Sequence, residues 1–360
     1  MTQTILIMAG GTGGHVFPGL AVANYLKSAG WRVVWLGTQS GMEIRLVPQH
    51  GFEIKTIDFS GLRGKRAVTW LTLPLRLLRA FWQSIQVIRE VKPNVVLGMG
   101  GYPAFPGGMM ASLMNKSLLI HEQNSVPGLT NKILAKLADK VLLGFPGVIQ
   151  TSRNNVIFSG NPVRDQIGQL DTPEERFQDR EGKLKLLVIG GSLGAQVLNT
   201  VVPEALKLLP QNMRPSVMHQ AGVKHLEALK QNYGDMVEDV ELVDFIDNMA
   251  ACYAGSDLVI CRAGALTISE LTVAGVASVL VPYPYAVDDH QTVNATYLSK
   301  NEAAFLLPQN ELTAKKLEKI LLENTREKLL AMAIAARSLA KPDATRIVAQ
   351  TCIEISEVQQ

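Results

Sequence analysis

The sequence predicts an α/β protein with two doubly wound, Rossmann-like domains, each a parallel sheet covered by helices. Its 360 residues exceed the size at which a single hydrophobic core usually keeps growing. Short apolar runs that end in glycine alternate with helical patterns, which is typical of parallel strands joined by crossover helices. The alternation begins again near residue 184, so we expect two sheets in tandem.

Four apolar runs mark the strands of the first predicted domain, and four more mark those of the second. The first four are ILIMAGG (5–11), RVVWLG (32–37), NVVLGMGG (94–101) and SLLIHEQN (117–124). The second four are LKLLVIGGSLGA (184–195), SVMHQAG (216–222), DLVICRAGALTISEL (257–271) and ASVLVPYP (277–284). Between the two sets, Pro162 disfavours helix in the residue before it, and residues 171–183 are dense in charge. We therefore expect domains at 1–162 and 163–341.

Charge, cysteine and histidine usage argue against several classes of protein. The formal net charge is only +3, which gives little reason to expect a nucleic-acid partner. The three cysteines and six histidines show no paired ligand spacing, so we expect no metal site and a reducing, cytoplasmic location. The opening residues lack the pattern of a secretion signal. Residues 93–115 are uncharged, but their prolines and glycines argue against a transmembrane helix.

Two glycine-rich turns follow predicted strands, GGTGG at 10–14 and GGSLG at 190–194. Backbone N–H groups in such a turn favour a phosphate, although a turn that needs positive φ explains each one alone. A dinucleotide-binding loop is disfavoured because Val16 replaces its third glycine, and Gly37 and Thr38 stand where the second strand would end in an acid. No Gly-Lys-Ser/Thr completes a nucleoside-triphosphate loop.

Six motifs in a fixed order extend over nearly the whole chain. They are GGTGGHVFPGLAVA (10–23), GMGGYPAFPG (98–107), HEQNSVPGLTNK (121–132), GNPVR (160–164), GGSLGA (190–195) and CRAGALTISE (261–270). In these motifs the sequence resembles the MurG glycosyltransferases of bacterial cell-wall synthesis. The resemblance implies a two-domain GT-B fold in which the C-terminal helix, 342–360, packs back on the first domain.

The resemblance also implies a reaction. It is the inverting transfer of N-acetylglucosamine from UDP-N-acetylglucosamine to the C4 hydroxyl of the muramyl sugar of lipid I. Lipid I is undecaprenyl-pyrophosphoryl-muramyl-pentapeptide, and the product is lipid II. No metal or other cofactor is implied, because in this fold the protein itself supplies the electrostatic stabilisation.

The resemblance places the donor in the second domain. Ser192 begins a helix after a strand, so its hydroxyl is expected near the diphosphate, with a helix cap as the alternative. Glu270 is expected to accept bonds from both ribose hydroxyls, with compensation of the helix dipole as the alternative. The backbone of Ile246 is expected to bind uracil, although Ile246 fits a core position equally well. The other positions carried over are Ala265, Leu266, Thr267, Ile268 and Ser269 at a helix start, Gln291 for the sugar hydroxyls, and Arg164 for departing UDP or for a surface salt bridge.

First-domain positions also match the family. Those that contact the donor side of the site are Thr12, Gly13, Gly14 and Asn124, and the acceptor diphosphate is an alternative guest for the same N–H groups. Inverting transfer needs a base for the acceptor proton. His15 is the sole histidine of the opening loop, and an imidazole titrates near neutral pH. A histidine packed into the helix start is the alternative, and Glu122 is a second candidate base.

Residues 61–89 combine basic, aromatic and leucine side chains. The basic ones are Arg63, Lys65, Arg66, Arg76, Arg79 and Arg89, and the large apolar ones include Trp70, Leu75, Leu78 and Trp82. Such a segment fits the bilayer interface, with its cations on anionic lipid. An amphipathic helix whose leucines face the core is the alternative. Because lipid I is anchored in the membrane, we expect peripheral attachment to the cytoplasmic face of the inner membrane.

Two other functions are open at this point. A UDP-N-acetylglucosamine 2-epimerase shares the fold and the donor but needs no lipid acceptor, and the GGTGGH loop and residues 61–89 argue against it. A scaffold that binds the nucleotide sugar without turnover is disfavoured because Arg164, Glu270 and Gln291 are all present.

Overall fold

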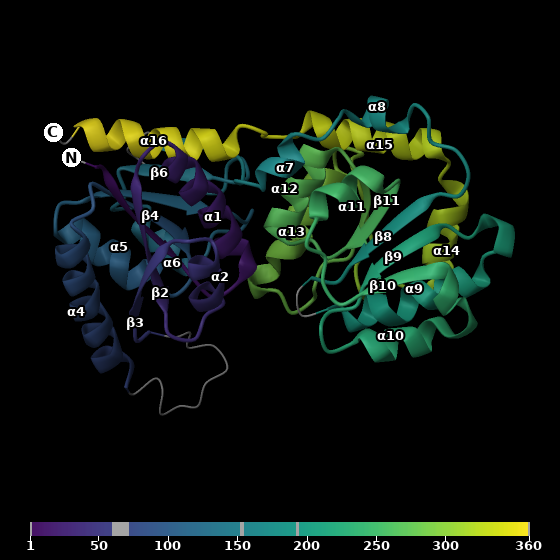
Figure 1. Ribbon diagram of the computed structural model, residues 1–360, viewed down its shortest axis with the longest axis horizontal. Coiled ribbons are helices and arrows are strands. Elements are labelled where there is room, and N and C mark those ends of the chain that lie inside the picture. The colour runs from purple at the N-terminus through teal and green to yellow at the C-terminus, as the bar shows by residue number, and fades with distance from the viewer. Residues whose placement is uncertain (1, 60–71, 152–154, 192–193, 359–360) are drawn as a thin grey trace. The chain divides into compact units, whose positions relative to one another are not determined.

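The computed structural model describes residues 2–59, 72–151, 155–191 and 194–358. The chain divides into two compact units (Figure 1). The first comprises Met1–Arg164 and Pro342–Gln360, and the second comprises Asp165–Lys341. The predicted α/β class with two parallel sheets is confirmed, because each unit contains one sheet whose strand pairs are all parallel.

The sheet of the first unit has the strand order β3-β2-β1-β4-β5-β6-β7, which is that of a doubly wound fold. Its strands are β1 (Thr4–Ala9), β2 (Arg32–Thr38), β3 (Glu53–Ile57), β4 (Val95–Gly100), β5 (Ser117–Glu122), β6 (Lys140–Leu143) and β7 (Val156–Phe158). The helices are α1 (Gly13–Ser28), α2 (Glu43–Gln49), α4 (Leu73–Val91), α5 (Ala104–Leu113), α6 (Leu129–Leu134) and α16 (Ala344–Val358).

Alternate residues of each central strand supply two separate cores. In β1, Ile5 and Ile7 pack with the core beneath α1 and α16, whereas Leu6 and Met8 pack with the core beneath α4 and α5. Helices therefore cover both faces of the sheet, as expected for continuous apolar strands. The last helix, α16, lies along α1 and contributes Val348 and other residues to their shared core (Figure 1).

The sheet of the second unit has the strand order β10-β9-β8-β11-β12-β13. Its strands are β8 (Lys185–Ile189), β9 (Ser216–Gln220), β10 (Val240–Val243), β11 (Leu258–Cys261), β12 (Ala277–Leu280) and β13 (Phe305–Leu306). The α-helices are α7 (Asp165–Gly168), α8 (Pro173–Phe177), α9 (Gln196–Leu208), α10 (Leu226–Tyr233), α11 (Met249–Gly255), α12 (Ala265–Ala274), α13 (His290–Ser299), α14 (Ala314–Glu323) and α15 (Arg326–Ser338). Short 3-10 turns lie at Gln211–Met213, Gly234–Asp239 and Val287–Asp289.

The charge-dense stretch 171–183 is an integral part of the second unit. The Arg180 guanidinium pairs with the fully buried Asp257 carboxylate at 2.6 Å, and Arg326 pairs with the same carboxylate at 3.3 Å. Asp257 also accepts the backbone N–H of Lys185 at 2.8 Å, which fixes the start of β8. The charges of this stretch therefore anchor the sheet of the second unit.

Two buried histidines, one in each unit, predict a loss of stability at acidic pH. Burial lowers the pKa of His121 from 6.5 to about 4, with a smaller contribution from His15, and it lowers the pKa of His219 from 6.5 to about 3. Below pH 6.5 the unfolded chain binds protons that the folded chain does not, so the stability present above this pH falls as the pH falls. At pH 5 we expect each histidine to cost its unit about 2 kcal/mol relative to pH 7.5.

Urea unfolding at pH 7.5 and pH 5 measures this loss. Neutral His219 donates from Nε2 to Asn199 Oδ1 at 3.1 Å, and its Nδ1 accepts the Tyr233 hydroxyl at 3.0 Å. We expect the variant His219→Gln to lose less stability on acidification than the parent, because the glutamine side chain does not bind a proton in this pH range. Equal losses in the two proteins would contradict the assignment.

Candidate active site

The first glycine turn connects β1 to α1, and the buried Glu43 carboxylate accepts a hydrogen bond from its backbone. Glu43 is fully buried, and its Oε2 accepts the backbone N–H of Gly11 at 3.1 Å. Its Oε1 accepts the backbone N–H and the hydroxyl of Thr38 at 2.9 and 2.8 Å. A Cβ atom at Gly10 or Gly41 would lie 2.6 or 2.0 Å from the Glu43 carboxylate oxygens. These glycines are thus needed for close packing against Glu43. Glu43 was not among the residues predicted from the sequence.

The last three residues of this turn, Thr12, Gly13 and Gly14, begin the helix. Thr12 is the N-cap of α1, with φ −118° and ψ 159°, and its carbonyl accepts the N–H groups of His15 and Val16. Its side chain forms no capping bond. Gly13 and Gly14 lie in the first turn, where backbone N–H groups have no acceptor within the helix. Both N–H groups, together with the positive end of the helix dipole, suit an anion.

The His15 ring is held by the end of β5. Its Nδ1 lies 2.9 Å from Oε1 of Gln123, a residue that sequence reasoning missed. The ring lies against the end of β4, where a Cβ atom at Gly100 would be 2.9 Å from the same Nδ1. Gly100 has φ +96°, so glycine is required there both for the backbone conformation and for the approach of the ring.

Glu122 organises the loop that follows β5. It is 2% exposed, and its Oε1 accepts the backbone N–H of Asn124 at 3.0 Å. Its Oε2 accepts the backbone N–H of Gly128 at 3.0 Å and the side-chain amide of Asn131 at 2.9 Å. Asn131 is a further residue that sequence reasoning did not single out. Because these N–H donors all come from residues after β5, the carboxylate ties the loop to the strand.

Arg164 lies at the end of the first segment of the first unit. Its guanidinium carbon is 5.1 Å from the centroid of the Phe17 ring, which belongs to α1. A cation over an aromatic face is favourable when it is partly desolvated. This contact holds the Arg164 side chain against the helix that begins at Gly13.

The residues of α12 predicted to bind the nucleotide-sugar donor divide into two groups. Ala265 and Ile268 are buried at 6% and 1% exposure, so their side chains belong to the core. Leu266, Thr267 and Ser269 are half-buried, and the Ser269 hydroxyl donates back to the carbonyl of Ala265 at 3.0 Å.

Glu270 is a buried carboxylate one turn into α12. It is 5% exposed, and its Oε2 accepts the Tyr253 hydroxyl at 3.1 Å. Burial of the Cys261 thiol, with a smaller contribution from the Glu270 charge, raises the pKa of Cys261 to about 12. A buried carboxylate held by a tyrosine has oxygen lone pairs suited to hydroxyl groups of a ligand.

The remaining residues predicted to bind the donor follow β10 and β12, which are separated by three strands in the sheet. Ile246 follows β10 and is 7% exposed. Gln291, in the first turn of α13, accepts the backbone N–H of Tyr283 through its Oε1 at 2.9 Å. Arg262 donates to the carbonyls of Val281 and Pro282, both at 3.1 Å, and so supports the same loop after β12. Ser192 lies outside the described residues.

Within each unit the described residues among those predicted lie in segments that follow the carboxyl ends of strands. In the first unit, the loops after β1 and β5 meet through the contact of His15 with Gln123. In the second unit, the segments after β11 and β12 are joined by the Asn294 side chain, which donates to the Ala263 carbonyl at 3.1 Å. Ligands of open parallel sheets bind at this edge.

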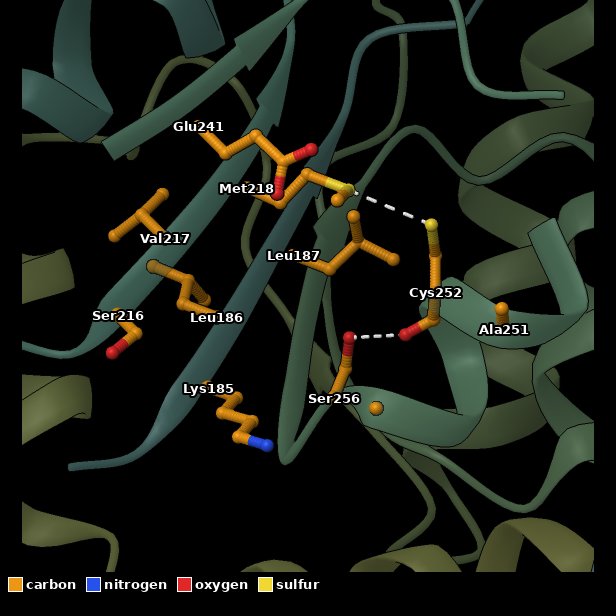
Figure 2. A pocket seen from close by; sticks show the side chains of 11 residues that line it. Lys185, Leu186, Leu187, Ser216, Val217, Met218, Glu241, Ala251, Cys252 and Ser256 are labelled. Atoms are coloured by element: carbon orange, nitrogen blue, oxygen red, sulfur yellow. Dashed lines mark hydrogen bonds between the residues drawn. The ribbon is translucent and has the colours of Figure 1, made fainter. Parts of the chain in front are cut away.

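A hollow in the second unit lies elsewhere. It is formed at the amino ends of β8 and β9 and beside α11, and its lining includes Lys185, Met218 and Glu241 (Figure 2). The Cys252 thiol points into it and contacts the Met218 sulfur at 3.5 Å (Figure 2). None of the predicted site residues lines this hollow.

The described residues form neither a candidate metal site nor a membrane-spanning helix. Among the residues with described placement, no three histidine, cysteine, aspartate or glutamate side chains are grouped so as to hold a metal ion. No helix of the described ranges is both long and apolar enough to cross a bilayer.

Two doubly wound parallel-sheet units in tandem are the fold of a two-domain glycosyltransferase. Residues 5–143 match the glycosyltransferase family 28 N-terminal domain, and residues 185–359 match its C-terminal domain. The chain therefore belongs to glycosyltransferase family 28 and is a glycosyltransferase.

Individual relatives and one solved structure are similar to the chain over nearly its whole length. The chain is 65% identical over 358 residues to a UDP-N-acetylglucosamine--N-acetylmuramyl-(pentapeptide) pyrophosphoryl-undecaprenol N-acetylglucosamine transferase of Nitrosospira multiformis, covering 99% of this chain and all of the relative. The protein of the same name from Nitrosomonas europaea is 60% identical, with 98% of each chain covered. The crystal structure of Acinetobacter baumannii MurG matches with a TM-score of 0.84 and 38% identity, covering 98% of this chain and 99% of that one.

Proposed function

We propose that this protein transfers N-acetylglucosamine from UDP-N-acetylglucosamine to the C4 hydroxyl of the muramyl sugar of lipid I, with inversion, and so forms lipid II. The observation that carries the proposal is 65% identity to a transferase of that name over 99% of the chain. His15, Glu270 and Gln291 lie in the first two turns of helices that follow parallel strands, and this placement supports the proposal.

Acceptor dependence tests the proposal. UDP-N-acetylglucosamine labelled in the sugar is incubated with a short-chain lipid I analogue, with its 4-deoxy-muramyl counterpart, or without acceptor, each with and without a chelator. We expect labelled product only with the first acceptor. UDP release in the absence of acceptor would point to a hydrolase or epimerase, and binding of donor without turnover would point to a scaffold.

In the proposed reaction the second unit holds the donor. Backbone groups of Ala265, Leu266 and Thr267 at the start of α12 bind the diphosphate, and Glu270 accepts the ribose hydroxyls. The backbone at Ile246 binds uracil. Gln291 binds hydroxyls of the transferred sugar, and its contact with Tyr283 supports this orientation. Ser192 is assigned to the diphosphate from the sequence alone.

The first unit supplies the acceptor side and the base. Thr12, Gly13 and Gly14 present N–H groups to the donor side of the site, with the acceptor diphosphate as the alternative ligand. The muramyl O4 attacks the anomeric carbon, the bond from that carbon to UDP breaks with its electron pair, and the O4 proton passes to His15. Arg164 offsets the charge that develops on UDP, and Asn124 contacts the donor. The bonds that Glu122 accepts favour a role in holding the loop over a role as base.

We propose that α4 attaches the protein to the cytoplasmic face of the bacterial inner membrane. Leu75, Leu78 and Trp82 are 71%, 63% and 59% exposed on one side of this helix. The opposite side, which includes Ala80 and Ile88, is buried in the core. The helix thus has a second apolar face that the core does not use, and residues 61–71 of the predicted segment lie outside the described residues.

The helices next to α4 also have exposed apolar side chains. α5 packs on α4, and α6 packs on α5. Leu113 at the end of α5 and Leu129 at the start of α6 are 71% and 74% exposed, and Lys132 and Lys136 beside them are also exposed. Apolar side chains with flanking cations suit an interface that contains anionic lipid.

Replacing Leu75, Leu78 and Trp82 together by serine is expected to weaken binding to anionic vesicles on the order of 10²-fold, because three apolar side chains no longer enter the interface. Co-sedimentation with vesicles measures the partition. The control is Leu208→Ser on α9, an apolar residue that is 51% exposed in the other unit. An unchanged partition of the triple variant would refute this attachment site.

A further inference from the structure

Three side chains of the first unit form a chain of hydrogen bonds that ends at the proposed base. His15 Nδ1 lies 2.9 Å from Gln123 Oε1. Gln123 Nε2 lies 3.1 Å from His121 Nδ1 and 3.2 Å from the backbone carbonyl oxygen of His121. His121 Nε2 lies 3.0 Å from the carbonyl oxygen of Gly160. Gln123 and His121 are 1% and 0% exposed, so bulk water is excluded from the bonds between these two residues, whereas the His15 ring is half-buried.

The bond of His121 Nε2 to Gly160 determines which ring nitrogen of His121 carries the proton. A carbonyl oxygen only accepts hydrogen bonds, so His121 Nε2 carries a proton and donates it to Gly160. Complete burial of the ring favours its neutral form, and its pKa is lowered to about 4. A neutral ring with a proton on Nε2 has a lone pair on Nδ1, so His121 Nδ1 is an acceptor.

The orientation of the Gln123 amide follows from two acceptors. His121 Nδ1 and the His121 carbonyl oxygen both face the same end of the Gln123 side chain. Only the NH2 group of the amide satisfies both, because its oxygen would meet two lone pairs there. The amide oxygen is therefore directed at His15, and His15 Nδ1 must be the donor of that bond.

We propose that Gln123 and His121 are positioning residues that fix the tautomer of His15, with its proton on Nδ1 and its lone pair on Nε2. This inference rests on the proposed function, in which His15 is the base, and it names the atom that accepts the proton. The O4 proton passes to Nε2, the ring becomes an imidazolium, and its Nδ1–H keeps the bond to Gln123 throughout the transfer. The rotation of the ring is set by the same bond and by its contact with Gly100.

The tautomers are tested directly by NMR on the full-length protein labelled with 15N in histidine. Two-bond 1H–15N spectra distinguish a proton on Nδ1 from one on Nε2, and His15→Ala and His121→Asn assign the two rings. At a pH where the rings are neutral, we expect His15 to carry its proton on Nδ1 and His121 on Nε2. A proton on Nε2 of His15 would overturn the inference, whatever the activity of the variants.

Kinetics of Gln123→Met test whether the residue acts through His15. We expect kcat to fall at least about tenfold with an unchanged KM for UDP-N-acetylglucosamine, and the His15 spectrum to shift toward the Nε2–H tautomer. In a His15→Ala background the same substitution should change kcat less than twofold, because the residue it positions is gone. A full additional loss in that background would show a merely structural role and overturn the proposal.

Failure of His15 as the base and failure of the positioning role of Gln123 and His121 give different experimental results. If His15→Ala keeps its activity while the tautomers are as stated, the role of His15 as base fails and the hydrogen-bond chain stands. If His15→Ala is inactive and Gln123→Met is unchanged in both kcat and tautomer, the positioning role fails and the proposed function stands.

Discussion

Replacing His15 by alanine is expected to lower kcat by about 10²- to 10⁴-fold, the usual contribution of a positioned general base. The dissociation constant for UDP-N-acetylglucosamine should stay within about threefold of the parent, because the proposed donor contacts lie on other residues. Steady-state kinetics with a short-chain lipid I analogue and calorimetric titration with the donor measure the two quantities.

The matched control is His50→Ala, an exposed histidine in the same unit whose Nδ1 bonds only to the Leu46 carbonyl among the described contacts. It should retain parent kinetics, and thermal unfolding of both variants should confirm that they are folded. If His15→Ala keeps its kcat, His15 has no part in the proton transfer.

Replacing Glu270 by alanine is expected to raise the dissociation constant for UDP-N-acetylglucosamine on the order of 10²-fold. The variant loses bonds from a carboxylate to two ribose hydroxyls, and bonds to charged groups contribute about 1.5–3 kcal/mol each. The same variant should bind N-acetylglucosamine 1-phosphate no worse than the parent does, since that ligand has no ribose. Calorimetric titration with both ligands measures the difference.

Tyr253→Phe separates ligand binding from support of the carboxylate. This substitution removes the hydroxyl that donates to Glu270 Oε2 and leaves the carboxylate in place. We expect a change in donor affinity below about tenfold, because the ribose contacts remain. Equal losses in Glu270→Ala and Tyr253→Phe would mean that Glu270 acts on the packing of α11 and α12 instead of on the ribose.

The fold was predictable because its signal is local. Apolar runs such as ILIMAGG indicate a strand that is buried on both faces, and the glycines that end this run and several others mark the turn into the next helix. The predicted class of two parallel α/β units is confirmed, as is membership of the predicted glycosyltransferase family.

The supporting residues of the candidate site were not predictable from such patterns. Glu43 bonds to Gly11 across 32 positions, and Gln123 bonds to His15 across 108. These pairs meet only because the sheet places the ends of distant strands side by side. From the sequence, Glu43 is an ordinary acid in the first turn of a helix, and Gln123 is a polar residue after a strand.

The sequence also did not show which side of α4 faces the core. Counting leucines and tryptophans in residues 61–89 shows an apolar segment but not which side chains the core takes. In the described part of that segment, Ala80 and Ile88 pack inward while Leu75, Leu78 and Trp82 remain exposed. The choice depends on the rotation of the helix against its sheet, which tertiary packing sets.

The structure of the product tests the central claim most directly. The parent enzyme is given UDP-N-acetylglucosamine and a short-chain lipid I analogue, and the linkage and anomeric configuration of the product are read by NMR. We predict a single product, with the new sugar on O4 of the muramyl residue and its configuration inverted relative to the donor. Retained configuration, attachment at another hydroxyl, or release of UDP with no glycosidic product would contradict the proposed reaction.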